Sequence, residues 1–267
     1  GQANTARGYR NVVVGHGNYA EGKNNQAFYK DNRILGRDNL AIGVQNTEIG
    51  INNVAVGEDN ALKGRDNVAF GRLNTLVGNL NVAKGDANNV HGDANRAFGF
   101  DNNVDGIKNS VYGKANSVDG DLNIVKGRRN TALGVSNLVV GEANKASGFA
   151  NEVHGYGNGV KGAQNLLIGN TNGVLGNDNI AKGQSNYAKG YNNIAWGADN
   201  ALYGKNNQAK GYGNLLKGSS NVVVGSHNLA EGEINKVAGD FNRVRGIDNR
   251  VKGIGNEVKG AKNCVEG

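Results

Sequence analysis

The chain of 267 residues contains no proline, no methionine and only one cysteine. Without proline, its 44 glycines do not indicate a collagen helix, which needs glycine at every third position and much proline. Cys264 has no second cysteine with which to form an internal disulfide. The absence of methionine, even at position 1, leads us to expect a processed product or a segment of a longer polypeptide.

Long hydrophobic runs and catalytic patterns are also missing. No apolar run approaches the ~20 residues that a membrane span requires, and no signal-peptide pattern opens the chain. The four histidines are scattered, and no Ser/His/Asp, Cys/His or zinc-ligand spacing recurs. We therefore expect no membrane span in this segment, no enzymatic activity, no cofactor and no metal.

What the chain does contain is a seven-residue repeat. Asparagine occupies every seventh position from Asn4 to Asn263, and the whole chain follows the heptad Asn-x-Φ-x-Gly-x-x, in which Φ is usually Val, Ala or Leu. The glycine column is broken only by Tyr29, and the Φ column only by Glu48. A fixed short period means one structural unit repeated end to end.

A coiled coil shares this period but is excluded, because it needs two apolar positions per heptad and no regular glycine. In x-Φ-x the middle side chain points one way and its neighbours the other, as in a strand. Gly-x-x-Asn then forms a tight turn, with glycine free to take positive φ. The sequence predicts an all-β solenoid, a parallel β-roll of two short strands and 14 residues per coil, with about 19 coils in a single domain over residues 1–267.

The asparagines of successive coils are expected to stack as two ladders, one at each corner. Side-chain amides both donate and accept, so a ladder can satisfy itself and the backbone of the turns. Glu48 would enter the thin core between Ile34 and Leu62, where an unpaired charge is costly. It is either protonated, partnered or moved outward by a bulge.

Segments such as Asn39-Leu-Ala-Ile-Gly43, Asn53-Val-Ala-Val-Gly57 and Asn67-Val-Ala-Phe-Gly71 resemble the head repeats of bacterial trimeric autotransporter adhesins. This resemblance covers the whole chain. It implies a left-handed roll, side-by-side association of three chains and binding to extracellular surfaces. The Asn-x-Val-x-Gly pattern also resembles that of the grass ice-recrystallisation-inhibition proteins, a related β-roll.

The two strands of a coil place their outward residues on opposite faces. Face A begins with Val12/Val14, and face B begins with Thr5/Arg7. Face A is rich in apolar residues up to Val224, and an apolar strip of that length predicts self-association, as a trimer or a dimer. The predicted self-association residues are Val12, Val14, Phe28, Leu40, Ile42, Val54, Val56, Val68, Phe70, Leu138, Val140, Leu166, Ile168, Ile194, Trp196, Val222 and Val224. The alternative is an ordinary strand surface in which Val and Ile are favoured.

Two polar clusters are further candidates. On face B, His91, Asp105 and Asp119 fall 14 residues apart in one column and could contact a cation or a sugar, or form a solvated polar face. Near the C-terminus, the cations Arg243, Arg245, Arg250 and Lys252 could contact an anionic surface, or simply form a solvated end. Nucleic-acid binding is not expected, because no recognised binding module is present.

These observations favour a non-enzymatic, extracellular or cell-surface structural and adhesive rod that self-associates along face A and presents a repetitive surface for adhesion to a surface or matrix ligand, or for fibre formation. Ice binding with inhibition of recrystallisation is the alternative, and a filament segment without a specific ligand is a second one. Ice binding would need a regular column of small hydroxyl-bearing residues. Face B has Thr5, Thr47, Thr75 and Thr131, but no continuous threonine ladder.

Overall fold

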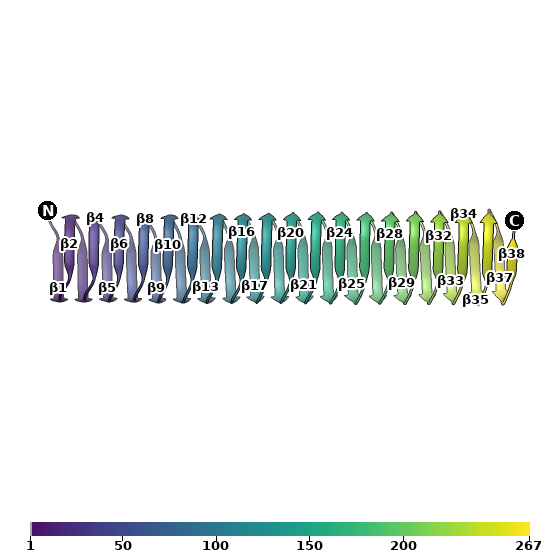
Figure 1. The fold of residues 1–267 in the computed structure, drawn as a ribbon, viewed down its shortest axis with the longest axis horizontal. Coiled ribbons are helices and arrows are strands. Elements are labelled where there is room, and N and C mark those ends of the chain that lie inside the picture. The colour runs from purple at the N-terminus through teal and green to yellow at the C-terminus, as the bar shows by residue number, and fades with distance from the viewer. Residues whose placement is uncertain (1) are drawn as a thin grey trace. The chain divides into compact units, whose positions relative to one another are not determined.

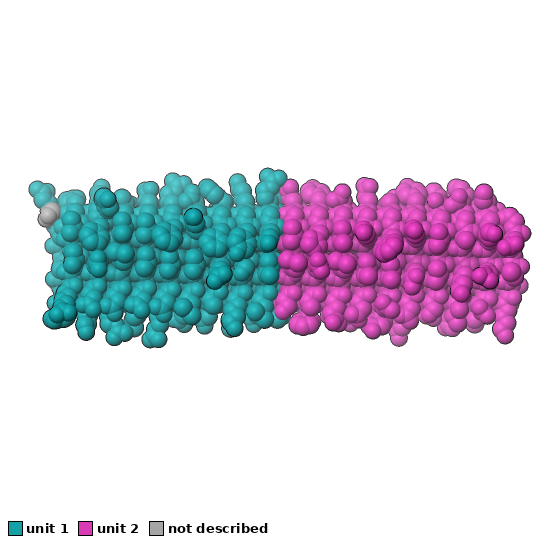
Figure 2. Space-filling view, viewed as in Figure 1, with its two compact units in different colours: residues 1–135 teal, residues 136–267 magenta. Residues whose placement is uncertain are grey.

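The computed structural model describes residues 2–267, which form 38 short strands and no helix (Figure 1). None of the described residues therefore belongs to a helix that could cross a membrane. The chain divides into two compact units, residues 1–135 and residues 136–267 (Figure 2). Each unit is a β-solenoid, and the prediction of a single domain stays a prediction.

Unit 1 contains the strands β1 (Thr5–Tyr9), β2 (Val12–His16), β3 (Tyr19–Lys23), β4 (Gln26–Lys30), β5 (Arg33–Arg37), β6 (Leu40–Val44), β7 (Thr47–Ile51), β8 (Val54–Glu58), β9 (Ala61–Arg65), β10 (Val68–Arg72), β11 (Thr75–Asn79), β12 (Val82–Asp86), β13 (Asn89–Asp93), β14 (Arg96–Phe100), β15 (Asn103–Ile107), β16 (Ser110–Lys114), β17 (Ser117–Asp121), β18 (Ile124–Arg128) and β19 (Thr131–Val135).

Unit 2 contains the strands β20 (Leu138–Glu142), β21 (Lys145–Phe149), β22 (Glu152–Tyr156), β23 (Gly159–Ala163), β24 (Leu166–Asn170), β25 (Gly173–Asn177), β26 (Ile180–Gln184), β27 (Tyr187–Tyr191), β28 (Ile194–Ala198), β29 (Ala201–Lys205), β30 (Gln208–Tyr212), β31 (Leu215–Ser219), β32 (Val222–Ser226), β33 (Leu229–Glu233), β34 (Lys236–Asp240), β35 (Arg243–Ile247), β36 (Arg250–Ile254), β37 (Glu257–Ala261) and β38 (Cys264–Glu266).

The strands pair in parallel with a constant register of 14 residues. In unit 1, Val54 of β8 pairs with Val68 of β10, and Thr75 of β11 pairs with Asn89 of β13. The odd-numbered strands form one sheet and the even-numbered strands form the other. The predicted all-β solenoid of about 19 turns, with two parallel sheets and 14 residues per turn, is confirmed. Its handedness stays a prediction.

The asparagine ladders hold the corners together. The Asn53 side chain donates from Nδ2 to Asn39 Oδ1 at 3.1 Å and to the Gly64 carbonyl at 3.0 Å, while its backbone N–H donates to Asn39 Oδ1 at 3.0 Å. This pattern recurs along both ladders, and the asparagines from Asn18 to Asn249 are buried. The predicted ladder is therefore confirmed.

The corners need positive φ at two positions. Gly57 has φ +126°, and a Cβ there would lie 1.9 Å from the Gly71 carbonyl oxygen, so only glycine fits. The residue before each asparagine is also left-handed, and it is often not glycine, as at Asp59 (φ 54°) and Leu80 (φ 59°). Tyr29 keeps a positive φ of 81° where the column otherwise has glycine. We did not predict the left-handed residue before asparagine, although Gly, Asn and Asp, which tolerate positive φ, are frequent at that position.

The core is one residue wide in each sheet, and large and small side chains complement each other. In unit 1, Ile34, Leu62 and Leu76 of the odd-numbered strands alternate along the chain with alanines of the even-numbered strands, and all are buried. Such complementary volumes suit close packing in a narrow space. The outward residues, which lie on either side of each core residue, therefore make up almost the whole accessible surface.

Glu48 enters this core in regular strand geometry, paired in register with Ile34 and Leu62 and fully buried. Its Oε1 accepts a hydrogen bond from the Ala55 N–H at 2.7 Å, and its Oε2 has no hydrogen-bond partner. Burial raises the pKa of this carboxyl from 4.5 to about 8, although the hydrogen bond from Ala55 opposes the shift. Of the three predicted alternatives, the structure therefore favours protonation, and it contains no bulge here.

Candidate functional site

The outer surfaces of the two sheets are the candidate functional sites, because each strand points its first and third residues outward. The even-numbered strands form face A, and the odd-numbered strands form face B. Rows of side chains in register cover the side of each unit that Figure 2 shows. Function therefore depends on which side chains fill each row.

Face A of unit 1 begins with five neighbouring even-numbered strands, from β2 to β10, whose outward residues carry no charge. They are Val12, Val14, Gln26, Phe28, Leu40, Ile42, Val54, Val56, Val68 and Phe70. Most are half-buried by their neighbours, whereas Val14 remains 53% exposed. Valine and isoleucine have stiff χ1 angles, so this part of face A is both apolar and rigid.

The uncharged stretch ends at β12, where Lys84 follows Phe70 in the same column. Beyond it, Phe98 and Tyr112 stack with their ring centroids 5.3 Å apart, and the Lys126 ammonium lies 6.0 Å from the Tyr112 ring centroid. This second part of face A combines bulky rings with long cations. The stretch from β2 to β10 is thus the longest uncharged surface on either face of the described residues.

Face B of unit 1 carries a column of short side chains from β7 to β19. The residues, in register, are Thr47, Ala61, Thr75, Asn89, Asn103, Ser117 and Thr131. The Asn89 Nδ2 donates to Asn103 Oδ1 at 2.9 Å within this column. The threonines alone did not indicate that every side chain of this column is short. The neighbouring column on face B, however, contains the charged residues Lys63, Asp105 and Asp119.

The predicted cluster of His91, Asp105 and Asp119 does form one column, because the three residues pair in register through β13, β15 and β17. Asp105 and Asp119 are exposed. Among residues 2–267, no group of three or more His, Cys, Asp or Glu side chains is arranged to hold a metal ion. A cation or sugar contact at this column stays a prediction.

Face A of unit 2 contains the remaining predicted self-association residues, but charged residues separate them. Leu138 and Val140 of β20 are followed in register by Glu152 and His154 of β22, whose side chains are hydrogen-bonded at 2.7 Å, and then by Leu166 and Ile168 of β24. Lys182 lies between Ile168 and Trp196, and Lys210 lies between Trp196 and Val224. The apolar strip is therefore discontinuous in this unit. Self-association stays a prediction.

The four cations predicted to contact an anionic surface do not form one cluster. Arg243 and Arg245 lie on face B in β35, whereas Arg250 and Lys252 lie on face A in β36. On face B, Arg245 Nε lies 2.9 Å from Glu231 Oε2. On face A, Lys252 Nζ lies 3.8 Å from Glu266 Oε1. The structure thus separates these cations by face and by ion pairing.

The Lys259 side chain, which lies 3.1 Å from Glu257, further neutralises face B at this end. Its hydrogen bond and charge lower the pKa of the Glu257 carboxyl. Because both groups are exposed, this pair contributes little to stability. The pair does, however, reduce the positive charge of face B. In the last turns of unit 2, three ion pairs reduce that charge.

Comparisons with known proteins identify a family with this scaffold. The model of the grass antifreeze β-roll family matches the chain over residues 29–127 and 176–267, which is well over half of its length. A search of curated proteins finds no match. Among solved structures, a "putative acetyltransferase" from Desulfovibrio desulfuricans G20 matches with 9% identity over 98% of this chain and 68% of that chain. Its TM-score of 0.18 is too low to carry an argument.

The family match corrects two predictions. The resemblance to trimeric autotransporter adhesins is wrong as an assignment, and so is the adhesive, self-associating rod inferred from it as the main function. The physical reason is that the Asn-x-Φ-x-Gly heptad specifies strands, corners and ladders, which different β-rolls can share. The repeat therefore predicted the scaffold correctly, but it did not distinguish between the two families.

Proposed function

The chain belongs to the grass antifreeze β-roll family, and from this premise we propose that it binds ice and inhibits ice recrystallisation. The family is non-enzymatic, and so is this chain. We place the ice-binding surface on face A of unit 1, over strands β2 to β10. The observation that supports this choice is the run of ten uncharged outward residues in five successive strands.

The argument for this surface starts from the chemistry of ice. Ice presents an uncharged, regularly repeated lattice of water, so a protein surface that binds it must also be regular and must release its own hydration easily. Charged groups hold their hydration strongly. A long lysine side chain also loses about 1.5–2 kcal/mol of conformational entropy when it is fixed. Valine and isoleucine hold their hydration less strongly than charged groups and lose less conformational entropy than lysine when they are fixed.

The scaffold supplies the regularity. Parallel strands lie ~4.8 Å apart, and the buried asparagine ladders hold each strand at that spacing. Val54, Val56 and Val68 therefore form repeated, rigid rows rather than a mobile surface. Many weak contacts along such rows add up to firm adsorption without a deep pocket.

Face B is the second candidate surface, because its column from Thr47 to Thr131 contains only short side chains, three of them threonines. The adjacent column weakens the case, since Lys63, Asp105 and Asp119 interrupt it with charges. We therefore prefer face A, and the experiment below distinguishes the two faces.

The test is adsorption of the fluorescently labelled protein to a growing ice crystal. The variant Val54→Lys/Val56→Lys places two charges on face A in β8, and Thr75→Lys/Val77→Lys places two on face B in β11. We expect the wild type and the face B variant to coat the crystal, and the face A variant to lose adsorption. Loss in the face B variant alone would move the site to face B. A wild type that never adsorbs would refute ice binding.

The same face A residues are those predicted to self-associate, and one surface cannot be buried against another chain and bind ice at the same time. Our proposal therefore requires the β2 to β10 surface to be accessible at working concentration. Mass measurement in solution tests this point, and we expect a 27.9 kDa monomer. A stable dimer or trimer that the Val54→Lys/Val56→Lys variant disrupts would instead support self-association.

An extracellular location completes the proposal. In a tissue, ice grows first in the water outside the cells. A protein that limits ice recrystallisation therefore acts in that extracellular space. The composition fits such exposure, because the chain has no methionine and only one cysteine to oxidise.

A further inference from the structure

Face A of unit 2 carries a series of positive charges over its last turns. From β24 to β36 its outward residues include the cations Lys182, Lys210, Lys236, Arg250 and Lys252, and no carboxylate. Face B of the same turns carries as many cations, but Glu231 and Glu257 pair with three of them. In the described residues, Lys182, Lys210, Lys236 and Arg250 of face A form no ion pair, against Lys189 and Arg243 of face B, so unpaired cations are more numerous on face A.

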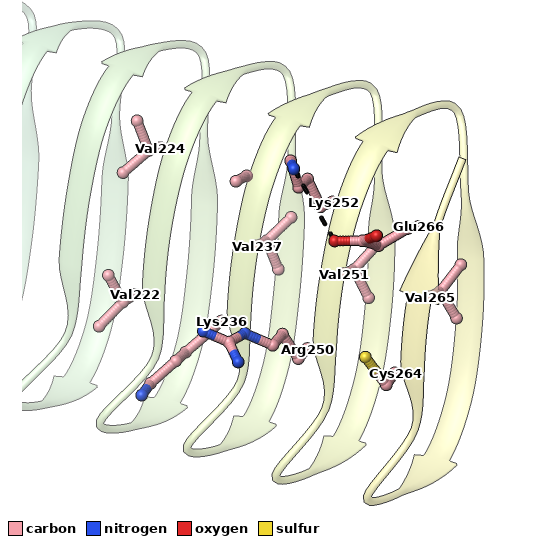
Figure 3. Close-up of a pocket in the computed structure, with 11 residues that line it drawn as sticks. Val222, Val224, Lys236, Val237, Arg250, Val251, Lys252, Cys264, Val265 and Glu266 are labelled. Carbon is pink, nitrogen blue, oxygen red and sulfur yellow. Dashed lines mark ion pairs between the residues drawn. The ribbon is translucent and has the colours of Figure 1, made fainter.

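Lys236 and Arg250 are the sharpest feature of this face. They are direct register partners on β34 and β36, both are exposed, and neither forms an ion pair in the described residues. Like charges on paired strands repel, so this arrangement lowers stability unless an anion lies between them. Figure 3 shows both side chains on one side of a hollow of about 510 Å³, with the Lys252–Glu266 ion pair on the other side.

Trp196 lies on the same face and gives the surface an aromatic platform. The residue is 46% exposed, and Lys182 and Lys210 precede and follow it in register. The Lys182 ammonium lies 6.0 Å from the ring centroid. A second, smaller hollow, lined in part by Trp196, Lys210 and Val224, adjoins the first through Val222 and Val224. Together they make a shallow trough along unit 2.

We propose that this trough, from Trp196 to Arg250, binds an acidic polysaccharide chain whose sugar rings carry carboxylates. A sugar ring presents an apolar face that stacks on an exposed indole. Its carboxylates accept charge-assisted hydrogen bonds from lysine and arginine. The strands that carry Trp196 and Arg250, β28 and β36, are four strand spacings apart, which is about 19 Å. The length of one sugar unit in an extended pyranose chain is similar to one strand spacing, so successive sugars can lie over successive strands.

An extended polymer fits this surface better than a small anion does. The hollows are shallow and the cations are exposed, so one isolated ion would gain little. A polymer contacts several cations at once, and each further contact forms at a high effective concentration. The inference goes beyond ice binding and does not depend on it, because it concerns a different unit and different residues.

The test measures affinity for polygalacturonate, with neutral dextran as the polymer control, at low salt and over a sodium chloride titration. The site variant is Lys236→Ser/Arg250→Ser. The matched control is Arg243→Ser/Arg245→Ser, which removes the same charge from the neighbouring strand on the opposite face. We expect wild-type binding to polygalacturonate but not to dextran. The site variant should bind about tenfold more weakly and the control less than about twofold more weakly.

A third variant, Trp196→Ala, tests the stacking contact. We expect about fivefold weaker binding to polygalacturonate at every salt concentration, because stacking is not screened. The circular dichroism spectra of all three variants should equal that of the wild type, which shows that each one is folded independently of any ice binding. Equal losses in the site and control variants, an unchanged Trp196→Ala variant or no wild-type binding would each overturn the proposal.

Discussion

At the scale of single residues, asparagine is fixed because the corner uses both ends of its side chain. Asn193 donates from Nδ2 to Asn179 Oδ1 at 2.9 Å and to the Gly204 carbonyl at 3.0 Å, and its Oδ1 accepts two hydrogen bonds from Asn207. Neither serine nor an apolar side chain can supply this set of donors and acceptors. The strict asparagine column was therefore sufficient to predict the ladder from the sequence.

We predict that Asn193→Val lowers the free energy of unfolding by about 3 kcal/mol or more, because buried donors and acceptors on both neighbouring turns lose their partners. Urea unfolding followed by circular dichroism measures this change. The control is Asn103→Val, since Asn103 is exposed on face B and valine suits a strand. It should change stability by less than about 0.5 kcal/mol. Similar values for the two variants would contradict a buried ladder.

Glu48 is the residue whose environment the sequence could not decide, since three conformations were compatible with its position. The structure buries it with one unpaired oxygen, and burial raises its pKa from 4.5 to about 8. Between these values the folded chain keeps a proton that the unfolded chain has lost. Stability therefore falls as pH rises from 4.5 to 8, and the contribution of Glu48 is constant above that range.

We predict that Glu48→Leu stabilises the protein and removes this pH dependence, because leucine already occupies the next two positions of the column, Leu62 and Leu76. The difference between variant and wild type should grow by on the order of 4–5 kcal/mol between pH 4.5 and pH 8.5. Unfolding by urea across that pH range measures it. A constant difference would show that Glu48 is ionised or solvated in the folded chain.

At the scale of the strand and its corner, the heptad predicted where each strand begins, but only half of the corner's conformation. Each strand ends two residues later than the predicted x-Φ-x, because the glycine and the residue after it also pair, as Gly57 and Glu58 do in β8. Glycine at positive φ was expected, whereas the left-handed residue before each asparagine was not. That position contains Asp, Asn, Ala, Leu and others, because the rigid ladder on the following asparagine fixes the backbone regardless of the side chain. Gly, Asn and Asp, which tolerate positive φ, occupy 16 of these 38 positions, and the other residue types carry the strain.

Ile234 is the clearest case of this strain, because a β-branched residue at φ 59° is strongly disfavoured. We predict that Ile234→Asn raises the free energy of unfolding by about 1 kcal/mol, since asparagine tolerates this conformation. The control is Ile247→Asn, an equally exposed corner residue without positive φ, which should bring no gain. Thermal unfolding of both variants provides the comparison, and an equal shift in the two would contradict the explanation.

At the scale of the whole molecule, the sequence predicted a repeated scaffold and two unlike faces, but it could not identify the function. The Asn-x-Φ-x-Gly heptad resembles the repeats of two families, and the family-model match identifies which of them the chain belongs to. The outward positions carry the difference. The uncharged run on β2 to β10 was visible in the sequence, where its apolar character indicated self-association rather than ice binding.

The C-terminal cations illustrate the same limit. Their count in the sequence indicated one basic patch, whereas the register places Arg243 and Arg250 on opposite faces. Ion pairs then form at Arg245 and Lys259 on face B and at Lys252 on face A, and Lys236 and Arg250 of face A form none in the described residues. Which cations are compensated depends on rotamers and neighbouring strands, so residue spacing alone could not predict it.

The most direct test of ice binding is the size of ice crystals after annealing a frozen solution of the protein. The wild type and the Thr75→Lys/Val77→Lys variant should keep the crystals small at low protein concentration. The Val54→Lys/Val56→Lys variant should let them grow as in buffer, because its charges hold liquid water on the β2 to β10 surface. Crystals that grow equally in wild-type protein and in buffer would contradict the proposed function.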